Sequence, residues 1–213
     1  MTALLLIDIQ NDFLHGGSLE VKDGNEIIPI ANAMIERFDR IVATQDWHPA
    51  NHGSFASQHE ENPFEVIDLH DLPQVLWPDH CVQGSFGAEF HGDLNTARID
   101  TIVQKGTDPT VDSYSGFADN GERIETQLHQ HLQDAGVDTL YVCGLATDYC
   151  VKFTVLDALK RGYTVWLIVD GCRGVNQHLH DSQQAIQEME NAGAQIIASV
   201  DVPLHRATSS SLG

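Results

Sequence analysis

Short apolar runs that alternate with helical patterns constrain the fold of this 213-residue chain more than any other feature. We predict six strands, over residues 3–9, 39–46, 99–106, 139–145, 163–171 and 194–200. We predict four helices, over residues 25–38, 121–136, 147–162 and 178–193. Strands that are apolar on both faces and alternate with helices are typical of a parallel sheet covered on both sides. We therefore expect an α/β fold with three layers (α/β/α) and a six-stranded, mostly parallel sheet.

A single domain is expected over the whole chain, 1–213, because this length suits one hydrophobic core and no linker interrupts the pattern. Residues 47–98 are predicted to be irregular, since they are rich in His, Pro, Gly and Asn. A loop region of this length is usually functional in a compact domain. The last residues, 206–213, are predicted to form a flexible tail.

The charge balance limits the classes of partner. The chain has 31 acidic and 11 basic residues, which gives a formal net charge of −20. Nucleic acids and anionic membranes bind basic surfaces, so we expect neither as a partner. A small-molecule substrate fits this composition better. The sequence shows no coiled-coil pattern, and the oligomeric state stays open.

Two further features indicate the cellular compartment. The N-terminal run MTALLLIDIQ is short and is broken by Asp8, so we predict neither a signal peptide nor a membrane span. The four cysteines lack the spacing of a zinc-binding motif, and we expect them to be reduced thiols. We therefore expect a cytoplasmic protein.

Reactive side chains stand at the ends of four predicted strands. Asp8 ends the first strand, and Asp46 ends the second. Lys105 ends the third, and Cys150 lies in the first turn of the helix that follows the fourth. In a parallel sheet these ends share one edge, which is where ligands bind. We expect the four side chains to converge there.

Cys150 has two interpretations. Free backbone N–H groups and the positive end of the helix dipole would stabilise a thiolate in that first turn, with Thr147 as the N-cap. The alternative is a small buried hydrophobic residue, which describes most cysteines, and we assign Cys143 and Cys172 to that class. Lys105 is either a solvated strand end or a cation that keeps a carboxylate and a thiolate ionised.

A metal site is indicated by the segment TQDWHPANHGSF, residues 44–55. Asp46 and His48 are two residues apart in an extended segment, so their side chains point the same way. His52 is a candidate third ligand, and the distant segment LWPDHC adds His80. Mixed carboxylate and imidazole ligands suit Zn, Fe or Mn. The alternative is a polar loop in a chain that has 12 histidines.

Taken together, these motifs resemble those of the nicotinamidases (pyrazinamidases) of the isochorismatase-like cysteine amidohydrolase family, over nearly the whole chain. The matching segments are LLIDIQNDFLHGGSL, TQDWHPANHGSF, WPDHCVQGSFGAEF, VQKGTDPTVDSYSGF and VCGLATDYCVKFTVLDAL. Isochorismatases proper lack the nucleophilic cysteine, so Cys150 argues against that branch.

The resemblance implies a role for each site residue. It implies a catalytic triad of Asp8, Lys105 and Cys150, and one divalent metal ion, most readily Zn, held by Asp46, His48, His80 and waters. His52 corresponds to a ligand in only some members. Phe13, Trp77 and Tyr114 correspond to the aromatic lining of the substrate pocket. The Leu145–Ala146 bond corresponds to a cis peptide that aims the N–H groups of Ala146 and Cys150 at one oxyanion.

The activity that the resemblance implies is the hydrolysis of nicotinamide to nicotinate and ammonia through a cysteine thioester, in NAD salvage, with pyrazinamide as a second substrate. The nearest alternative is an N-carbamoyl-amino-acid hydrolase, which would not need the metal. A second is a hydrolase whose nucleophile is a metal-bound hydroxide. The third is a binding module without turnover on a hydrolase scaffold.

Overall fold

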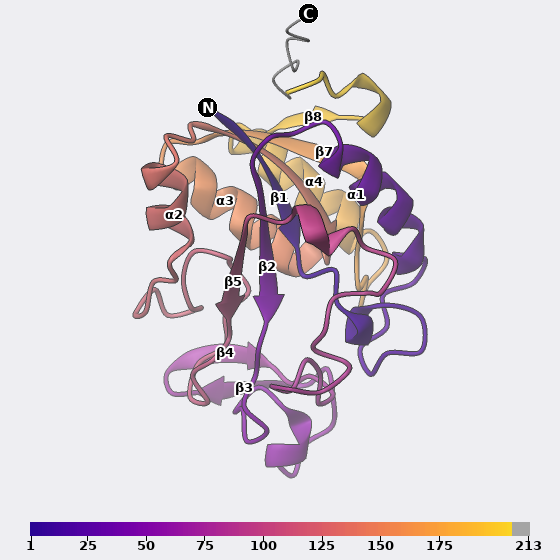
Figure 1. The fold of residues 1–213 in the computed structure, drawn as a ribbon. Helices are drawn as coiled ribbons and strands as arrows, with labels where there is room; N and C mark the ends of the chain where they lie inside the picture. The colour runs from indigo at the N-terminus through magenta and orange to yellow at the C-terminus, as the bar shows by residue number, and fades with distance from the viewer. Residues whose placement is uncertain (206–213) are drawn as a thin grey trace, which may run out of the picture.

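A computed structural model of the chain describes residues 1–205, and the predicted flexible tail, 206–213, lies outside the described residues. Eight strands and four α-helices make up its regular structure (Figure 1). The strands are β1 (Thr2–Ile7), β2 (Ile41–Asp46), β3 (Val66–Leu69), β4 (Leu72–Val75), β5 (Thr101–Lys105), β6 (Thr139–Leu145), β7 (Thr164–Arg173) and β8 (Gln195–Ile197). The helices are α1 (Ile27–Ile35), α2 (Leu128–Asp134), α3 (Lys152–Lys160) and α4 (Asp181–Asn191).

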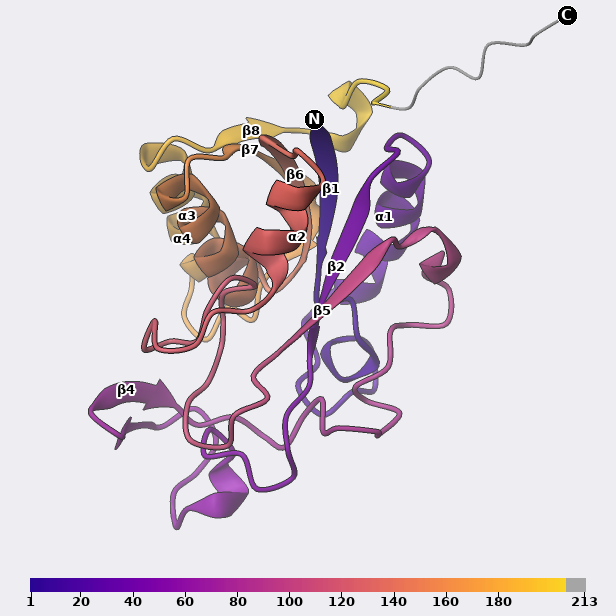
Figure 2. The same cartoon turned by 60° about the vertical axis from the view of Figure 1, so that its left-hand side comes forward.

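Six of the strands form one sheet in the order β5-β2-β1-β6-β7-β8, and every neighbouring pair is parallel. This confirms the predicted six-stranded α/β sheet. Helix α1 lies on one face of the sheet, and α2, α3 and α4 lie on the other, which gives three layers (Figure 2). Among residues 1–205, no helix is long and apolar enough to cross a membrane.

The hydrophobic core is built on the central strand β1. Its residues Leu4, Leu5, Leu6 and Ile7 are all at most 1% exposed, because helices cover both faces of the sheet. Pro29 lies in the first turn of α1, where its missing N–H costs no hydrogen bond.

The order of the strands reverses between β1 and β6. From β1 the chain moves outward to β2 and then to β5, whereas from β6 it moves the other way to β7 and β8. Such a reversal opens a crevice at the carboxyl ends of the two central strands. The residues that follow β1 and β6 therefore lie at the place where this class of fold binds its ligands.

The segment predicted to be irregular, 47–98, contains a hairpin that the sequence did not reveal. Strands β3 and β4 pair antiparallel around His70 and Asp71, which both have positive φ (54° and 68°). A two-residue hairpin turn of this kind is usually signalled by glycine or asparagine, and neither is present here.

Helix α2 is much shorter than the predicted helix over 121–136. The carboxylate of Asp119 accepts hydrogen bonds from the N–H groups of Gly121, Arg123 and Ile124, at 2.7–3.0 Å. These bonds fold the segment into a turn and compete with the helical pattern. The helix therefore begins only at Leu128.

Candidate active site

The four strand-end residues lie together, as the sequence predicted. Asp8 follows β1, Asp46 ends β2 and Lys105 ends β5. Cys150 lies in a π-helical turn, Thr147–Val151, between β6 and α3. All four side chains are at most 7% exposed. The crevice between β1 and β6 thus contains a thiol, an amine and two carboxylates.

Lys105 is the centre of this cluster. Its Nζ lies 3.0 Å from Asp8 Oδ2 and 2.5 Å from Asp46 Oδ1, and it donates to the carbonyl of Ser113 (2.8 Å). The same nitrogen lies 3.4 Å from Cys150 Sγ. Burial would lower the pKa of Lys105, but the neighbouring carboxylates outweigh it and hold the pKa well above its usual range. The amine is therefore a permanent cation, which excludes the solvated strand end that the sequence had left open.

The two carboxylates have opposite electrostatic environments. Burial raises the pKa of Asp8 to about 6, although Lys105 and the Thr44 hydroxyl (2.6 Å from Oδ1) oppose the shift. Burial also favours a higher pKa for Asp46, but the nearby Lys105 and His48 outweigh this effect and hold the pKa of Asp46 below its usual range. Asp46 is thus a fixed anion, whereas Asp8 takes up a proton just below neutral pH.

One oxygen of Asp8 is free to accept that proton. Among residues 1–205, no hydrogen-bond donor is aligned with Asp8 Oδ2, although Lys105 lies 3.0 Å away. A carboxylate oxygen of Asp8 and Cys150 Sγ lie within 4.8 Å of each other. Asp8 φ is 47°, a left-handed backbone conformation that is uncommon outside glycine and is found at functional sites.

The predicted thiolate at Cys150 is wrong for the resting protein. Burial raises the pKa of this thiol well above its usual range, and Lys105 opposes the shift only in part. Thr147 is not the N-cap: the cap is Ala146, and no side chain caps the turn. The thiol is neutral at rest because burial outweighs the helix terminus, so a base must remove its proton before it can attack.

The backbone before Cys150 has the feature that the resemblance implied, a cis peptide between Leu145 and Ala146. The N–H groups of Tyr149 and Val151 both donate to the carbonyl of Ala146, at 3.1 Å. Cys150 lies between them, in the first turn of the helical segment.

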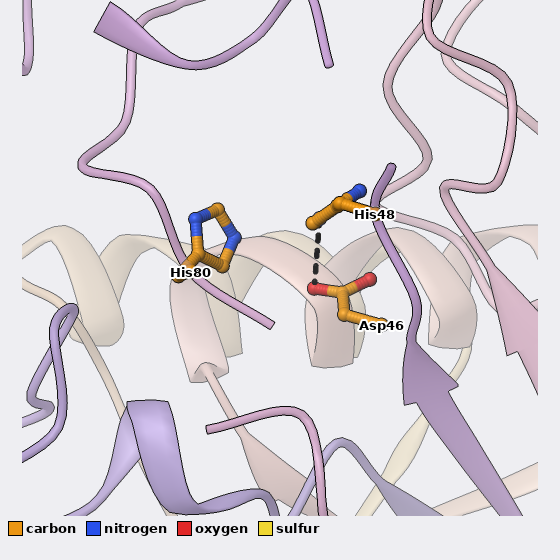
Figure 3. A group of neighbouring side chains, drawn as sticks. All are labelled: Asp46, His48 and His80. Carbon is orange, nitrogen blue, oxygen red and sulfur yellow. Dashed lines mark ion pairs between the residues drawn. The ribbon is translucent and has the colours of Figure 1, made fainter. Parts of the chain in front are cut away.

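Asp46, His48 and His80 offer one ligand atom each within 4.8 Å of one another, and all three are buried. Figure 3 shows the three side chains and the ion pair between His48 Nε2 and Asp46 Oδ2, which is 3.7 Å long. His48 Nδ1 donates to the carbonyl of Gly106 and His80 Nδ1 donates to that of Pro78, both at 2.8 Å. These bonds leave each Nε2 with a lone pair, and a backbone carbonyl behind the imidazole is the usual support of a metal-binding histidine. The residues therefore fit one divalent metal ion.

Gly106 fits this site for a steric reason. Its φ is 63°, and a Cβ at this position would collide with the imidazole of His48. The glycine lets the backbone approach the ring closely enough to accept its hydrogen bond.

We expect Gly106→Ala to lower zinc affinity by about 10–100-fold, because it displaces His48 from its carbonyl partner. A zinc titration against a chromophoric chelator measures this. Gly136→Ala is the matched control, since Gly136 has a φ of 65° but no atom within 4 Å of the added methyl. Equal zinc affinities for the two variants would show that the contact with His48 does not matter.

A pocket opens beside Cys150 and the metal residues. The predicted aromatic residues Phe13, Trp77 and Tyr114 line it. Four residues that the sequence analysis did not single out also line it: Leu19, Asp112, Tyr149 and Val175. Tyr149 adjoins Cys150 in sequence, which is a usable signal, and its ring lies 4.8 Å from that of Trp77. Val175 lies far along the chain, and nothing in its local sequence marks it.

Comparison with known proteins gives the family. Residues 2–201 match the isochorismatase domain model. The nicotinamidase of Escherichia coli is 53% identical over 203 residues, which cover 93% of this chain and 95% of that protein. The Acinetobacter baumanii nicotinamidase/pyrazinamidase structure superposes with a TM-score of 0.90 at 46% identity, over 94% of this chain and 97% of that one. The pyrazinamidase of Pyrococcus horikoshii in complex with zinc has a TM-score of 0.76 at 40% identity, over 92% and 98%. The chain therefore belongs to the isochorismatase domain family.

Proposed function

We propose that this protein is a nicotinamidase, which hydrolyses nicotinamide to nicotinate and ammonia through a thioester on Cys150. One observation carries the proposal: Asp8, Lys105 and Cys150 form a single buried cluster that adjoins Asp46, His48 and His80. The relatives named nicotinamidase support the choice of substrate. The role in NAD salvage that the resemblance implies is part of the proposal.

In the first half-reaction Asp8 takes the thiol proton and Cys150 Sγ attacks the carboxamide carbon. The C–N bond breaks, and Asp8 returns the proton to the leaving nitrogen, which departs as ammonia. Lys105 stabilises the negative charge as it passes from Asp8 to Sγ. The N–H groups of Ala146 and Cys150 donate to the oxyanion, each contributing about 3 kcal/mol to the transition state by analogy with other oxyanion holes.

In the second half-reaction water adds to the thioester carbon, the C–S bond breaks, and nicotinate leaves while the thiol regains its proton. A carboxylate with a pKa of about 6 serves as base and acid in turn, because both of its protonation states are accessible near neutral pH. Asp8 is therefore suited to both half-reactions.

The metal residues and the aromatic pocket position the substrate. Asp46, His48 and His80 would hold one divalent ion, zinc by preference, which would supply a Lewis acid for the pyridine nitrogen of the substrate. Phe13 and Trp77 offer apolar faces to a planar ring. Burial raises the pKa of Tyr114 well above its usual range, so its hydroxyl stays neutral. Pyrazinamide has the same shape, and we expect it to be a second substrate.

We expect kcat/KM to fall as the pH is lowered through about 6, with a slope of one. The base must be ionised, and Asp8 is protonated below its pKa. The measurement is a pH profile for nicotinamide in the metal-loaded enzyme. A profile that stays flat to pH 5, or an Asp8→Asn variant with an unchanged inflection, would exclude Asp8 as the base.

The test of the function is to mix zinc-loaded protein with nicotinamide and to quantify ammonia and nicotinate, which should appear in equal amounts. An N-carbamoyl amino acid in a parallel reaction tests the nearest alternative. Turnover of that compound alone would favour the carbamoyl hydrolase, and tight nicotinamide binding without turnover would favour a binding module.

Removal of the metal should abolish nicotinamide turnover, and added zinc should restore it, because Asp46, His48 and His80 lie beside the pocket. The measurement is ammonia release after dialysis against a chelator, with the metal content of each sample determined. Full activity in metal-free protein would contradict a role for this site in substrate binding.

A further inference from the structure

A second group of buried side chains adjoins the metal residues. His48, His52 and Asp112 offer ligand atoms within 4.8 Å of one another, and each is at most 3% exposed. The imidazole centroids of His48 and His52 are 4.4 Å apart. The mechanism above uses neither His52 nor Asp112, and the sequence had left the role of His52 open.

The hydrogen bonds of His52 assign its proton. Its Nδ1 accepts the backbone N–H of Ser54 (3.2 Å) and lies 2.7 Å from the Ser54 hydroxyl. A backbone N–H can only donate, so Nδ1 carries the lone pair. An imidazole side chain carries at least one proton, and because Nδ1 of His52 carries a lone pair, that proton is on Nε2.

This arrangement is the reverse of that of His48 and His80, whose Nδ1 atoms donate to backbone carbonyls and whose Nε2 atoms carry the lone pairs. His48 Nε2 lies 3.7 Å from Asp46 Oδ2. A nitrogen that bears a proton cannot bind a metal ion. His52 Nε2 has no hydrogen-bond partner among residues 1–205 although it is buried. It is thus a donor on a ring whose centroid lies 4.4 Å from that of His48.

Asp112 is held in place by uncharged donors. Its Oδ1 accepts the N–H of Ser113 (2.7 Å), and its Oδ2 accepts Gln74 Nε2 (3.0 Å). The same Gln74 nitrogen also donates to the hydroxyl of Tyr114 (3.1 Å), so Asp112 is linked to the wall of the substrate pocket. Neither contact supplies a positive charge, and a buried carboxylate without one is costly.

The formal charges of the buried groups show which positive charge the Asp112 carboxylate helps to neutralise. The site and its surroundings contain three buried carboxylates, those of Asp8, Asp46 and Asp112, and one buried ammonium, that of Lys105, which contacts the first two. Imidazoles that bind a metal ion are neutral, and with a neutral thiol this leaves an excess of two negative charges. A divalent cation at Asp46, His48 and His80 neutralises that excess.

We infer that His52 and Asp112 form a hydrogen-bonding layer beside the metal centre and are not metal ligands. The negative charge of Asp112 helps to neutralise the divalent cation. Both are positioning residues in the proposed nicotinamidase site, and the inference rests on that site binding a metal. The tests below measure metal binding and do not depend on nicotinamide turnover. A protein that binds metal but does not turn over nicotinamide would contradict the proposed function without contradicting this inference.

The first test uses the unaltered, zinc-loaded protein. Long-range proton–nitrogen NMR correlations distinguish the two imidazole tautomers, and His52→Gln and His80→Gln spectra assign the signals. We expect His48 and His80 to carry the proton on Nδ1 and His52 to carry it on Nε2. A metal-bound Nε2 at His52 would overturn the inference.

The second test compares metal binding among variants. His52→Gln should change zinc affinity by no more than about 10-fold, and Asp112→Asn should lower it by about 10–100-fold. In the cobalt-loaded protein, both should keep the absorption spectrum of the parent, because no ligand is lost. His80→Gln should change that spectrum and lose more than about 100-fold in affinity.

Asp108→Asn is the control for charge, since Asp108 lies near the site in sequence but is bonded to Thr110 on the surface. Its zinc affinity should equal that of the parent. An Asp112→Asn variant that also binds zinc like the parent would overturn the charge balance, and a His52→Gln spectrum like that of His80→Gln would make His52 a ligand. Were His52→Gln not to fold, the NMR signals would be assigned with Ser54→Ala, and the tautomer test would decide.

Discussion

Replacing Cys150 with alanine is expected to lower kcat for nicotinamide by at least about 10⁴-fold, because the thiol is the only group that forms the covalent bond in the proposed mechanism. Fold and metal content should be unchanged, since the side chain becomes smaller and Cys150 lies outside the set of Asp46, His48 and His80. The measurement is ammonia release by zinc-loaded parent and variant.

Cys143→Ala is the matched control for this experiment. Cys143 is buried like Cys150 (0% and 7% exposed), but it lies within β6 and does not line the pocket. We expect it to keep nearly full activity. Near-full activity of Cys150→Ala would instead identify a metal-bound hydroxide as the nucleophile, which is the second alternative that the sequence left open.

Lys105→Met is expected to have the largest effect on stability. The substitution removes the one cation between Asp8 and Asp46 and leaves two buried carboxylates without it. Breaking a buried pair in this way costs about 3–5 kcal/mol of unfolding free energy, and the metal-free protein should show all of it. Nicotinamide turnover should also be lost, because no positive charge remains beside the thiolate. Urea denaturation of metal-free and zinc-loaded samples measures the first effect.

Lys160→Met serves as the control for Lys105→Met. Lys160 also contacts two carboxylates, those of Glu122 and Asp157, but its side chain is 64% exposed. Exposed pairs of this kind contribute at most about 1 kcal/mol, so its unfolding curve should stay close to that of the parent. A Lys105→Met protein as stable as the Lys160→Met protein would mean that Asp8 and Asp46 are not both charged at rest.

Much of this site could be predicted from the sequence because the fold converts strand ends into neighbours. Asp8, Asp46, Lys105 and Cys150 are dispersed along the chain, yet each stands where a predicted strand ends, and a parallel sheet brings those ends to one edge. The periodicity of the apolar residues, which predicts where the strands end, was therefore sufficient to predict that these four side chains lie together.

The errors in the sequence analysis came from interactions that periodicity does not contain. The start of α2 is set by the side chain of Asp119, which captures three backbone N–H groups. The protonation of Cys150 depends on its burial, which a helix position does not specify. The role of His52 depends on which of its nitrogens Ser54 contacts. Each of these depends on a local hydrogen bond or on how deeply a side chain is buried, and both are seen only in the three-dimensional structure.

The most direct test of the account is to quench the zinc-loaded enzyme during nicotinamide turnover with acid and to search its peptides by mass spectrometry for a nicotinoyl group. The proposed mechanism predicts a thioester on the peptide that contains Cys150, absent before substrate is added and absent from Cys150→Ala. Rapid turnover with no acylated peptide, in a protein whose Cys150→Ala variant is equally active, would contradict it.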